Sequence, residues 1–333
     1  MNALVTGGGG FLGMAIVKLL IKRGDTVRSF SRNEYPALTK FGTEHYRGEL
    51  GDADAVLRAA EGCDIVFHVA AKAGVWGPYE EFYRANVVGT KNVIEACRQH
   101  GIRKLVHTSS PSVVFDGSDM EGVDESVPYP EHFEAFYPQT KAKAEQLVLQ
   151  ANDEQLATVA LRPHLIWGPE DNHLVPRILE RGAKGALRRI GTRDCLADTI
   201  YIDNAATAHL QAADQLDIGS IVSGKAYFLS QGEPLPIWDI VDRILAAGGM
   251  PPVTGTLSPK LAYGIGWILE KSYGLFGIKS EPRMTRFVAK ELSTAHWFDI
   301  SAARNDFGYT PTVSFDEGML RLKAWLSGNT PRS

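Results

Sequence analysis

Thr6-Gly-Gly-Gly-Gly-Phe-Leu-Gly13 joins a short apolar segment, residues 2–6, to a segment with apolar residues at helical spacing, residues 11–23. In a dinucleotide-binding loop of the form G-x-x-G-x-x-G, the first glycine permits a tight turn, the second lets the backbone approach a pyrophosphate, and the third lets helix and strand pack closely. The free N–H groups of the helix N-terminus then face the phosphates. A plain glycine turn is the alternative. The strand–turn–helix context favours a cofactor loop with the contacts Gly7, Gly10, Phe11, Leu12 and Gly13.

Strand and helix signals alternate through the first half of the chain. Segments typical of buried strands stand at 26–30, 64–70, 104–108 and 158–162, and helical segments at 53–60, 79–100 and 137–151. This alternation predicts a parallel sheet covered by helices on both faces. After Pro163 the alternation weakens and the predicted helices shorten.

We therefore predict an α/β fold, a Rossmann-type doubly wound parallel sheet with a smaller, mostly helical C-terminal substrate domain. Residues 1–165 form the NAD(P)-binding domain, and residues 166–333 form a substrate-binding region whose strand near 227–230 rejoins the first sheet. Ala70, at the end of a predicted strand, is assigned to cofactor binding as well.

The composition narrows the class of function. The 333 residues carry a net charge of -4, which gives no basic footprint for nucleic acid. The three cysteines, Cys63, Cys97 and Cys195, have no metal-ligand spacing, so we expect reduced thiols and no metal site. No apolar stretch reaches the roughly 18 residues that span a bilayer, and nothing resembles a signal peptide. These features predict a cytoplasmic protein without a transmembrane segment.

The end of the second strand indicates which nicotinamide cofactor is bound. An NAD enzyme places Asp or Glu there to bind the ribose 2′-hydroxyl, whereas this chain has Ser31 and Arg32 and no acid before Glu34. A hydroxyl and a guanidinium suit a 2′-phosphate. NADP(H) is therefore the preferred cofactor and NAD(H) the alternative; a solvated surface charge is the other interpretation of Arg32.

Tyr137-Pro-Gln-Thr-Lys141 places a tyrosine and a lysine on one helix face. The ammonium can stabilise a tyrosinate and so lower the phenol pKa, while also binding the nicotinamide ribose. Tyr137 can then act as the general acid for a ketone or the general base for an alcohol. Of the 11 tyrosines, only Tyr137 has a lysine four residues on.

Two further polar groups are candidates for the catalytic centre. A serine after the strand at 104–108 would face the cofactor crevice and orient the substrate oxygen; Ser110 is the first choice, Ser109 the second and Ser112 the third, with turn capping as the alternative for each. Asn86, in the middle of the helix predicted at 79–100, either holds backbone or water near Lys141 or is an exposed helix residue.

In their order and spacing, the segments 6–13, 86–90, 108–113 and 137–141 resemble the extended short-chain dehydrogenases/reductases. Leu161-Arg-Pro-His-Leu-Ile-Trp-Gly-Pro169 and Tyr201-Ile-Asp-Asn-Ala205 match further motifs of that family. Within it the chain is similar to the 3β-hydroxysteroid dehydrogenase branch. Segments 71–77, 160–168, 225–236 and 296–309 make it resemble the 2-alkyl-3-oxoalkanoate reductases of bacterial long-chain olefin biosynthesis, a group inside that branch.

This resemblance implies NADPH-dependent reduction of the 3-keto group of a 2-alkyl-3-oxoalkanoic acid. It also implies that backbone from Pro163 to Ile166 lines the nicotinamide, that other enzymes of the olefin pathway are partners, and that a homodimer forms through the helices at 79–100 and 137–151. The chain departs from the family at Gly48-Glu-Leu50, where Asp is usual at the middle position, so an adenine contact by Glu49 is carried over only weakly.

The substrate side is less defined. Leu261 to Ile278 is apolar and aromatic, so it is a lid or tunnel wall, a membrane-surface contact, or a buried helix pair, which we favour. Arg188 or Arg193 could bind a substrate carboxylate, although surface solvation is the expected state of each. Structural hydrogen bonding is the expected role of His107 and His164.

Two other functions stay open beside the ketoacid reductase. One is an NAD(P)-dependent 3β-hydroxysteroid or sterol-4-carboxylate 3-dehydrogenase, and the other is a non-catalytic nucleotide-binding sensor. A sensor has no use for an intact Ser–Tyr–Lys set. The missing acid after the second strand favours reduction with NADPH.

Overall fold

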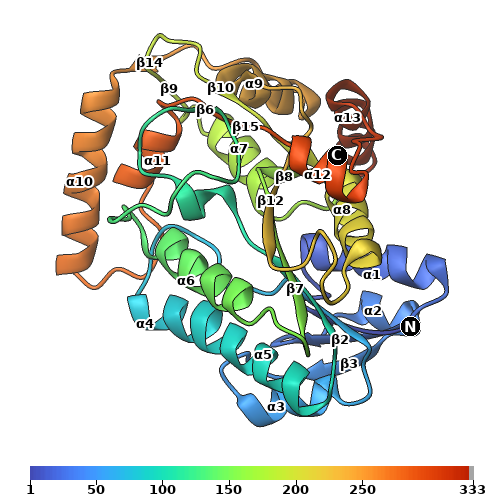
Figure 1. The fold of residues 1–333 in the computed structure, drawn as a ribbon. Helices are drawn as coiled ribbons and strands as arrows, with labels where there is room; N and C mark the ends of the chain where they lie inside the picture. The colour runs from blue at the N-terminus through green and yellow to red at the C-terminus, as the bar shows by residue number, and fades with distance from the viewer. Residues whose placement is uncertain (330–333) are drawn as a thin grey trace.

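Seven parallel strands form the main sheet, in the order β12-β7-β5-β4-β1-β2-β3 (Figure 1). The computed structural model describes residues 1–329. The seven strands are β1 (Asn2–Thr6), β2 (Thr26–Ser31), β3 (Glu44–Arg47), β4 (Ile65–His68), β5 (Lys104–Thr108), β7 (Ala157–Pro163) and β12 (Lys225–Leu229). The order of the strands reverses between β1 and β4, and ligands bind at such a switch point in open α/β sheets. The predicted doubly wound Rossmann-type sheet is confirmed.

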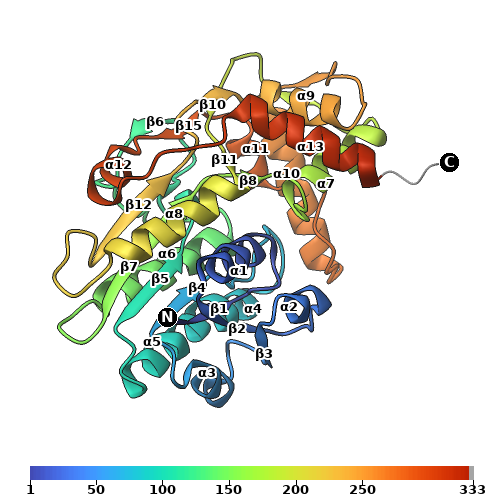
Figure 2. The same ribbon diagram turned by 90° about the vertical axis from the view of Figure 1, so that its right-hand side faces the viewer.

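Both faces of this sheet are buried, because side chains alternate along each strand. In β1, Val5 packs with α1 and α8 on one face, while Leu4 packs with α3, α5 and α6 on the other. Figure 2 shows α1 and α8 together, and Figure 1 shows α5 and α6 on the opposite side. These helices are α1 (Phe11–Arg23), α3 (Ala53–Ala60), α5 (Gly89–Gln99), α6 (Phe136–Gln150) and α8 (Ile202–Gln215).

The helix predicted at 79–100 is not a single regular α-helix. The chain forms α4 (Tyr79–Phe82), then a π-helical turn (Tyr83–Val88), and then α5. Asn86 stands inside the π-helical turn, and its side chain is hydrogen-bonded outside the helix. Such turns recur at functional sites.

The second half of the chain adds one strand to the main sheet and builds a smaller layer beside it. β12 pairs with β7, which is where the sequence placed a returning strand. A second sheet has the order β13-β10-β15-β6, and its strand β6 comes from the first half of the chain. The remaining elements are α2 (Pro36–Lys40), β6 (Met120–Val123), β8 (Ile166–Trp167), α7 (Leu174–Ala183), β9 (Arg189–Ile190), β10 (Leu196–Ala197), β11 (Ile200–Tyr201), β13 (Leu235–Pro236), α9 (Ile237–Ala247), β14 (Thr256–Leu257), α10 (Pro259–Leu275), α11 (Arg286–Glu291), β15 (His296–Phe298), α12 (Ser301–Phe307) and α13 (Phe315–Asn329).

The buried helix pair favoured at 261–278 is wrong. The segment is one helix, α10, on the outside of the molecule (Figure 1). It packs on α11 through small residues: a Cβ on Gly266 would lie 2.6 Å from the carbonyl carbon of Thr285. The large apolar side chains at and just after α10 face outward, with Leu275 and Phe276 81% and 74% exposed. No helix within residues 1–329 is long and apolar enough to cross a membrane.

Candidate active site

The glycine loop joins β1 to α1 at the switch point of the sheet. Gly7 has φ +72°, a conformation that favours glycine, and a Cβ there would lie 3.0 Å from Ala70 Cα. A Cβ on Gly13 would lie 2.1 Å from the Gly7 carbonyl oxygen, so only glycine lets α1 approach the loop this closely. Thr6 Oγ1 accepts a hydrogen bond from the Ala70 N–H (3.1 Å), which joins the ends of β1 and β4.

The N-terminus of α1 has the form that a pyrophosphate requires. Gly10 is its N-cap residue, and within the described chain no side chain caps the first turn. Phe11 is half-buried and Leu12 is buried, so backbone N–H groups rather than side chains form the open surface. The residues present therefore fit a dinucleotide.

Two guanidinium groups stand at the adjacent ends of β2 and β3. Ser31 is opposite Arg47 in the strand register. Arg32 is exposed, and its carbonyl accepts a hydrogen bond from Arg47 Nε (3.1 Å). Glu34 is the nearby acid, 4.0 Å from Arg47. Sequence reasoning missed Arg47, which could have been found as the last residue of the next parallel strand.

Lys141 is buried under the carboxyl end of β5. Its Nζ donates to the Thr108 carbonyl (2.6 Å) and lies 3.2 Å from His107 Nε2. Burial lowers the pKa of the Lys141 ammonium to about 8, and the carboxylate of Glu145, one helical turn further, opposes this. His107 therefore has a direct contact with a predicted catalytic residue, beyond the structural role expected for it.

Tyr137 stands in the first turn of α6, half-buried and one turn before Lys141. The pKa of its phenol is raised above the ordinary value by burial, which a hydrogen bond with Ser110 partly offsets, and by the Glu291 carboxyl. The lowering by Lys141 that the sequence predicts is therefore not found among the described residues. The Lys141 ammonium contacts the Thr108 carbonyl and His107, and no hydrogen bond joins it to Tyr137 within residues 1–329.

The three candidate serines differ in their contacts. Ser110 Oγ is 2.9 Å from Ser112 Oγ and accepts from the Ser112 N–H (3.3 Å), so it caps the short 3₁₀ turn Pro111–Val114. Its hydroxyl also forms the hydrogen bond that lowers the pKa of the Tyr137 phenol. The Ser109 hydroxyl is buried and has no hydrogen-bond partner among the described residues. These contacts favour Ser110 as the serine beside Tyr137. Ser110 also caps the turn, the alternative role that the sequence left open.

Asn86 is buried, so its interpretation as an exposed helix residue is wrong. Its Oδ1 accepts from the Lys72 N–H (2.7 Å), and its Nδ2 donates to the Lys72 carbonyl (3.1 Å) and to Thr140 Oγ1 (3.0 Å). Thr140 precedes Lys141 on α6. Asn86 thus holds the segment after β4 and the helix that carries Lys141, without touching Lys141 itself.

His68, at the end of β4, is a buried histidine that the sequence did not indicate as a site residue. Both ring nitrogens of His68 are hydrogen-bonded, Nδ1 to Thr6 and Nε2 to Thr90, each at 2.9 Å. Burial, and to a lesser extent the nearby Lys141 charge, lowers the pKa of His68 to about 3. The ring is therefore neutral and ties β1 to α5.

A sharp turn follows β7, where Pro163 to Ile166 were expected to line the nicotinamide. Leu165 has φ +44°, which is unusual for a residue with a side chain and recurs at functional sites. His164 Nδ1 is 2.8 Å from Asp198 Oδ1, the structural role expected for it. Pro163 ends the strand and Ile166 is half-buried in β8.

A cavity of about 510 Å³ lies between α10 and the residues that lead into α6. Trp76 closes one side by donating from Nε1 to the Ile278 carbonyl (3.0 Å). Apolar and aromatic side chains dominate its lining, among them Val75, Trp76, Phe133, Phe136, Tyr273 and Ile278. Phe136, which lines the cavity, precedes Tyr137 in the chain. Residues of α10 line the other side, so this helix is a wall of the cavity as well as an exposed helix.

Arg188 and Arg193, the candidates for a substrate carboxylate, are exposed and have other partners. Arg193 forms a two-pronged ion pair with Asp119, one contact being 2.7 Å. Arg188 donates to the carbonyls of Gly185 and Leu187. Glu49, the weak candidate for an adenine contact, pairs with Arg84 (3.5 Å). The contacts of Arg188 and Arg193 thus agree with the surface position expected for each.

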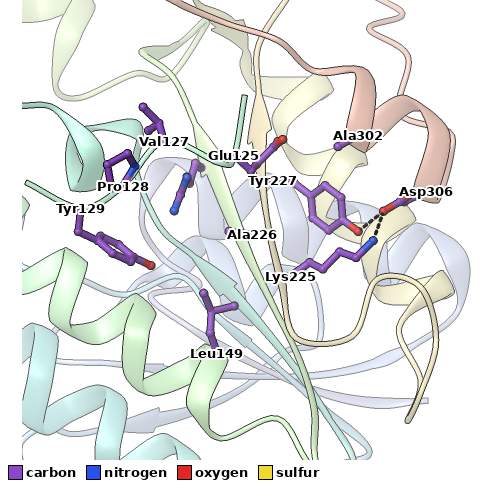
Figure 3. A pocket seen from close by; sticks show the side chains of 11 residues that line it. Glu125, Val127, Pro128, Tyr129, Leu149, Lys225, Ala226, Tyr227, Ala302 and Asp306 are labelled. Atoms are coloured by element: carbon purple, nitrogen blue, oxygen red, sulfur yellow. Dashed lines mark hydrogen bonds and ion pairs between the residues drawn. The ribbon is translucent and has the colours of Figure 1, made fainter. Parts of the chain in front are cut away.

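A second cavity, of about 370 Å³, lies beside the edge strand β12. There the Tyr227 hydroxyl and the Lys225 ammonium both point to Asp306, at 2.6 and 2.9 Å (Figure 3). None of the predicted site residues lines it. Among residues 1–329, no group of three or more His, Cys, Asp or Glu side chains is arranged to hold a metal ion.

Comparison with known proteins gives close relatives over the whole length. The 2-alkyl-3-oxoalkanoate reductase of Stenotrophomonas maltophilia is 53% identical over 326 residues, covering 97% of this chain and 99% of that protein. The protein of the same name from Shewanella oneidensis is 51% identical, covering 98% and 86%. The sterol-4-alpha-carboxylate 3-dehydrogenase, decarboxylating, of Mus musculus is 34% identical, covering 95% and 88%.

Solved structures share the fold. The crystal structure of gox2253 is 28% identical with a TM-score of 0.79, covering 98% of each chain. A Thermus thermophilus UDP-glucose 4-epimerase, in complex with NAD, has a TM-score of 0.75 at 24% identity, covering 99% and 100%, and shows the fold alone.

The family model described as 3-beta hydroxysteroid dehydrogenase/isomerase matches residues 4–258. Together with the named reductases and dehydrogenases, it confirms the predicted oxidoreductase acting on CH–OH or keto groups. The chain belongs to the 3-beta hydroxysteroid dehydrogenase/isomerase family, within the extended short-chain dehydrogenases/reductases.

Proposed function

We propose that this protein reduces the 3-keto group of a 2-alkyl-3-oxoalkanoic acid to the 3-hydroxy acid with NADPH, in long-chain olefin biosynthesis. The observation that carries the proposal is the pair Tyr137 and Lys141 on α6, together with an apolar cavity lined by Phe136, the residue before Tyr137. Two relatives more than 50% identical are named for this substrate class. We also propose that residues 1–165 hold the cofactor and residues 166–333 most of the substrate.

The nucleotide would be held at the switch point of the sheet. Gly7, Gly10 and Gly13 leave the backbone open to a pyrophosphate, with Phe11, Leu12 and Ala70 beside it. Pro163 and Ile166 would border the nicotinamide. Ser31 and Arg32, now joined by Arg47, would receive a 2′-phosphate, which is why NADPH is preferred over NADH. When bound, NADPH supplies the hydride to the ketone carbon.

Protein groups perform the proton chemistry. Tyr137 donates its phenolic proton to the ketone oxygen, and Ser110 holds that oxygen through its hydroxyl. The Lys141 ammonium, fixed by the Thr108 carbonyl and His107, stabilises the resulting tyrosinate. Asn86 positions α6 through Thr140. One alkyl chain would occupy the cavity under α10.

The experiment follows NADPH and NADH oxidation by absorbance, with a freshly prepared 2-alkyl-3-oxo acid, for wild type and Tyr137→Phe. The proposal predicts oxidation with a preference for NADPH that the substitution abolishes. A 3β-hydroxysteroid with NAD(P)⁺ is run in parallel, because relatives at 34% identity are named sterol dehydrogenases. Turnover of the steroid alone would favour that second function, and cofactor binding without either reaction would favour a sensor.

Two associations belong to the same proposal. The exposed apolar side chains of α10 and the residues after it, such as Leu275 and Phe276, would contact a membrane surface from which a lipid-like substrate enters the cavity. A homodimer that forms through α5 and α6 would leave the α10 surface uncovered. The dimer could then work next to other enzymes of the olefin pathway.

A further inference from the structure

The packing of α10 on the rest of the molecule loosens toward the C-terminal end of the helix. At Gly266 a Cβ would lie 2.6 Å from the Thr285 carbonyl carbon, so α10 touches the start of α11 there. At Gly274, about two turns later, a Cβ would meet nothing within 4 Å among residues 1–329. Gly274 lines the cavity of about 510 Å³, so the space beside this glycine is part of that cavity.

Gly274 lies on the face of α10 that is turned toward the cavity. Glu270 and Tyr273 line the same cavity, and Glu270 precedes Gly274 by four residues, so both project from one helix face. Gly274 is exposed, which means that the cavity is open to solvent at this position. Glycine destabilises a helix relative to alanine, and no group in the described chain requires the space here. The missing side chain therefore keeps the cavity open.

The charged groups at this cavity are already paired with one another. Arg286 donates from its backbone N–H and from Nε to the two carboxylate oxygens of Glu270, each at 2.7 Å. Glu134 pairs with Lys290 (2.6 Å) and lies 3.8 Å from Arg286. Lys279, the other cation of the lining, is exposed to solvent. The rest of the lining is mostly apolar and aromatic, which suits a hydrocarbon chain rather than a charged ligand.

Another wall of the cavity is fixed by hydrogen bonds. Trp76 Nε1 donates to the Ile278 carbonyl (3.0 Å), and the indole meets the Tyr273 ring edge-on, with 6.1 Å between the ring centroids. The segment that carries Trp76 is anchored in turn, because Asn86 binds the N–H and the carbonyl of Lys72. The room for a chain therefore depends on the open side of the cavity, where α10 has no side chain.

We propose that Gly274 determines the length of the alkyl chain that this protein accepts under α10. The inference rests on the proposed function, which places one alkyl chain in this cavity, and adds the position that sets its limit. A chain that extends from the reacting carbon passes Phe136 and leaves the cavity at Gly274. Glycine lets the chain continue past the helix, whereas a larger side chain at this position would stop it inside the cavity.

The kinetic test compares wild type, Gly274→Leu and Gly264→Leu with 2-alkyl-3-oxo acids in which one of the two alkyl chains is lengthened stepwise. Each methylene group that leaves water strengthens binding about fourfold. A leucine that excludes two or more methylene groups should lower kcat/KM for the longest substrate at least about tenfold, while the shortest substrate is reduced as by wild type.

Gly264→Leu is the matched control on the same helix. A Cβ at Gly264 also meets nothing within 4 Å in the described chain, but this glycine shares the outward face with Leu261 and Ile268, which are 54% and 56% exposed. This variant should follow the chain-length profile of wild type. A profile of Gly274→Leu that equals wild type, or one lowered equally at every chain length, would overturn the inference.

A binding measurement separates this inference from the reductase proposal. Calorimetric titration with decanoic and tetradecanoic acid in the presence of NADP⁺ needs no turnover. Gly274→Leu should bind tetradecanoic acid at least about tenfold more weakly than wild type, and decanoic acid within about threefold, with NADP⁺ affinity unchanged as evidence of folding. If wild type shows this binding but reduces no oxo acid, the proposed function fails and the role of Gly274 stands. Equal affinities of both proteins for tetradecanoic acid, or no binding by wild type, reject the inference.

Discussion

Lys141 is a buried ammonium whose surroundings are nearly neutral. His107 and His68 are uncharged beside it, and Glu145 is already bonded to Arg162, so burial lowers the Lys141 pKa to about 8. The ammonium stabilises tyrosinate only while it is protonated. We therefore expect kcat/KM for ketone reduction to be level at neutral pH and to fall about tenfold per pH unit above about pH 8. A decline that begins only near pH 10 would show that Lys141 keeps an ordinary pKa.

Ser110 and Ser109 are adjacent in the chain. The Ser110 hydroxyl is hydrogen-bonded, whereas the Ser109 hydroxyl has no partner within residues 1–329, so substitutions at the two positions can be compared. Ser110→Ala removes the hydroxyl that acts on Tyr137, so we expect kcat to fall by a factor on the order of 100. Ser109→Ala removes a hydroxyl without a partner in the described chain and should change kcat less than about threefold. The reverse ranking in steady-state kinetics would move the substrate contact to Ser109.

At the scale of elements, α1 packs so closely on the glycine loop that no side chain fits at Gly13. In Gly13→Ala the new Cβ would lie 2.1 Å from the Gly7 carbonyl oxygen, so loop and helix must separate. We expect NADPH affinity, followed by fluorescence, to fall at least about 100-fold, because the helix N-terminus no longer faces the pyrophosphate. Gly264→Ala in α10, where a Cβ meets nothing within 4 Å, is the control. Equal affinities in the two variants would remove the glycine loop from the cofactor site.

Elements differ in how far their sequence predicts them. The bounds of α3 and the strand β5 match the prediction, because Asp52 caps the helix and apolar strands are short and distinct. The segment 261–278 was misjudged, since an apolar run does not tell which face another element covers. Gly266 of α10, which packs against Thr285 at the start of α11, was the local signal. The π-helical turn around Asn86 depends on Lys72 and Thr140, partners distant in sequence.

At the scale of the whole molecule, four buried histidines within residues 1–329 are neutral. Burial lowers the pKa of His68 to about 3, those of His209 and His296 to about 4, and that of His107 well below its usual range. In the unfolded chain they titrate near pH 6.5. The free energy of unfolding is therefore highest above that pH. It decreases as the pH falls toward 4, by about 1.4 kcal/mol per histidine and pH unit, because the unfolded chain takes up protons that the folded chain does not. Urea midpoints should drop between pH 7 and pH 5; equal midpoints would contradict the neutral buried state.

The sequence indicates candidate site residues where their pattern is local. The glycine loop and the Tyr137/Lys141 pair each lie within eight residues, and their type and spacing are enough to indicate their roles. Arg47 and the contact of His107 with Lys141 were missed because they arise from strand register and packing between distant segments.

The most direct test of the central claim is transfer of deuterium from NADPH labelled at C4 of the nicotinamide to a 2-alkyl-3-oxo acid, followed by mass spectrometry. The account predicts one deuterium at C3 of the 3-hydroxy acid with wild type, from one face of the cofactor only, and no labelled product with Tyr137→Phe. An unlabelled hydroxy acid, or labelling that persists in the Tyr137 variant, would contradict it.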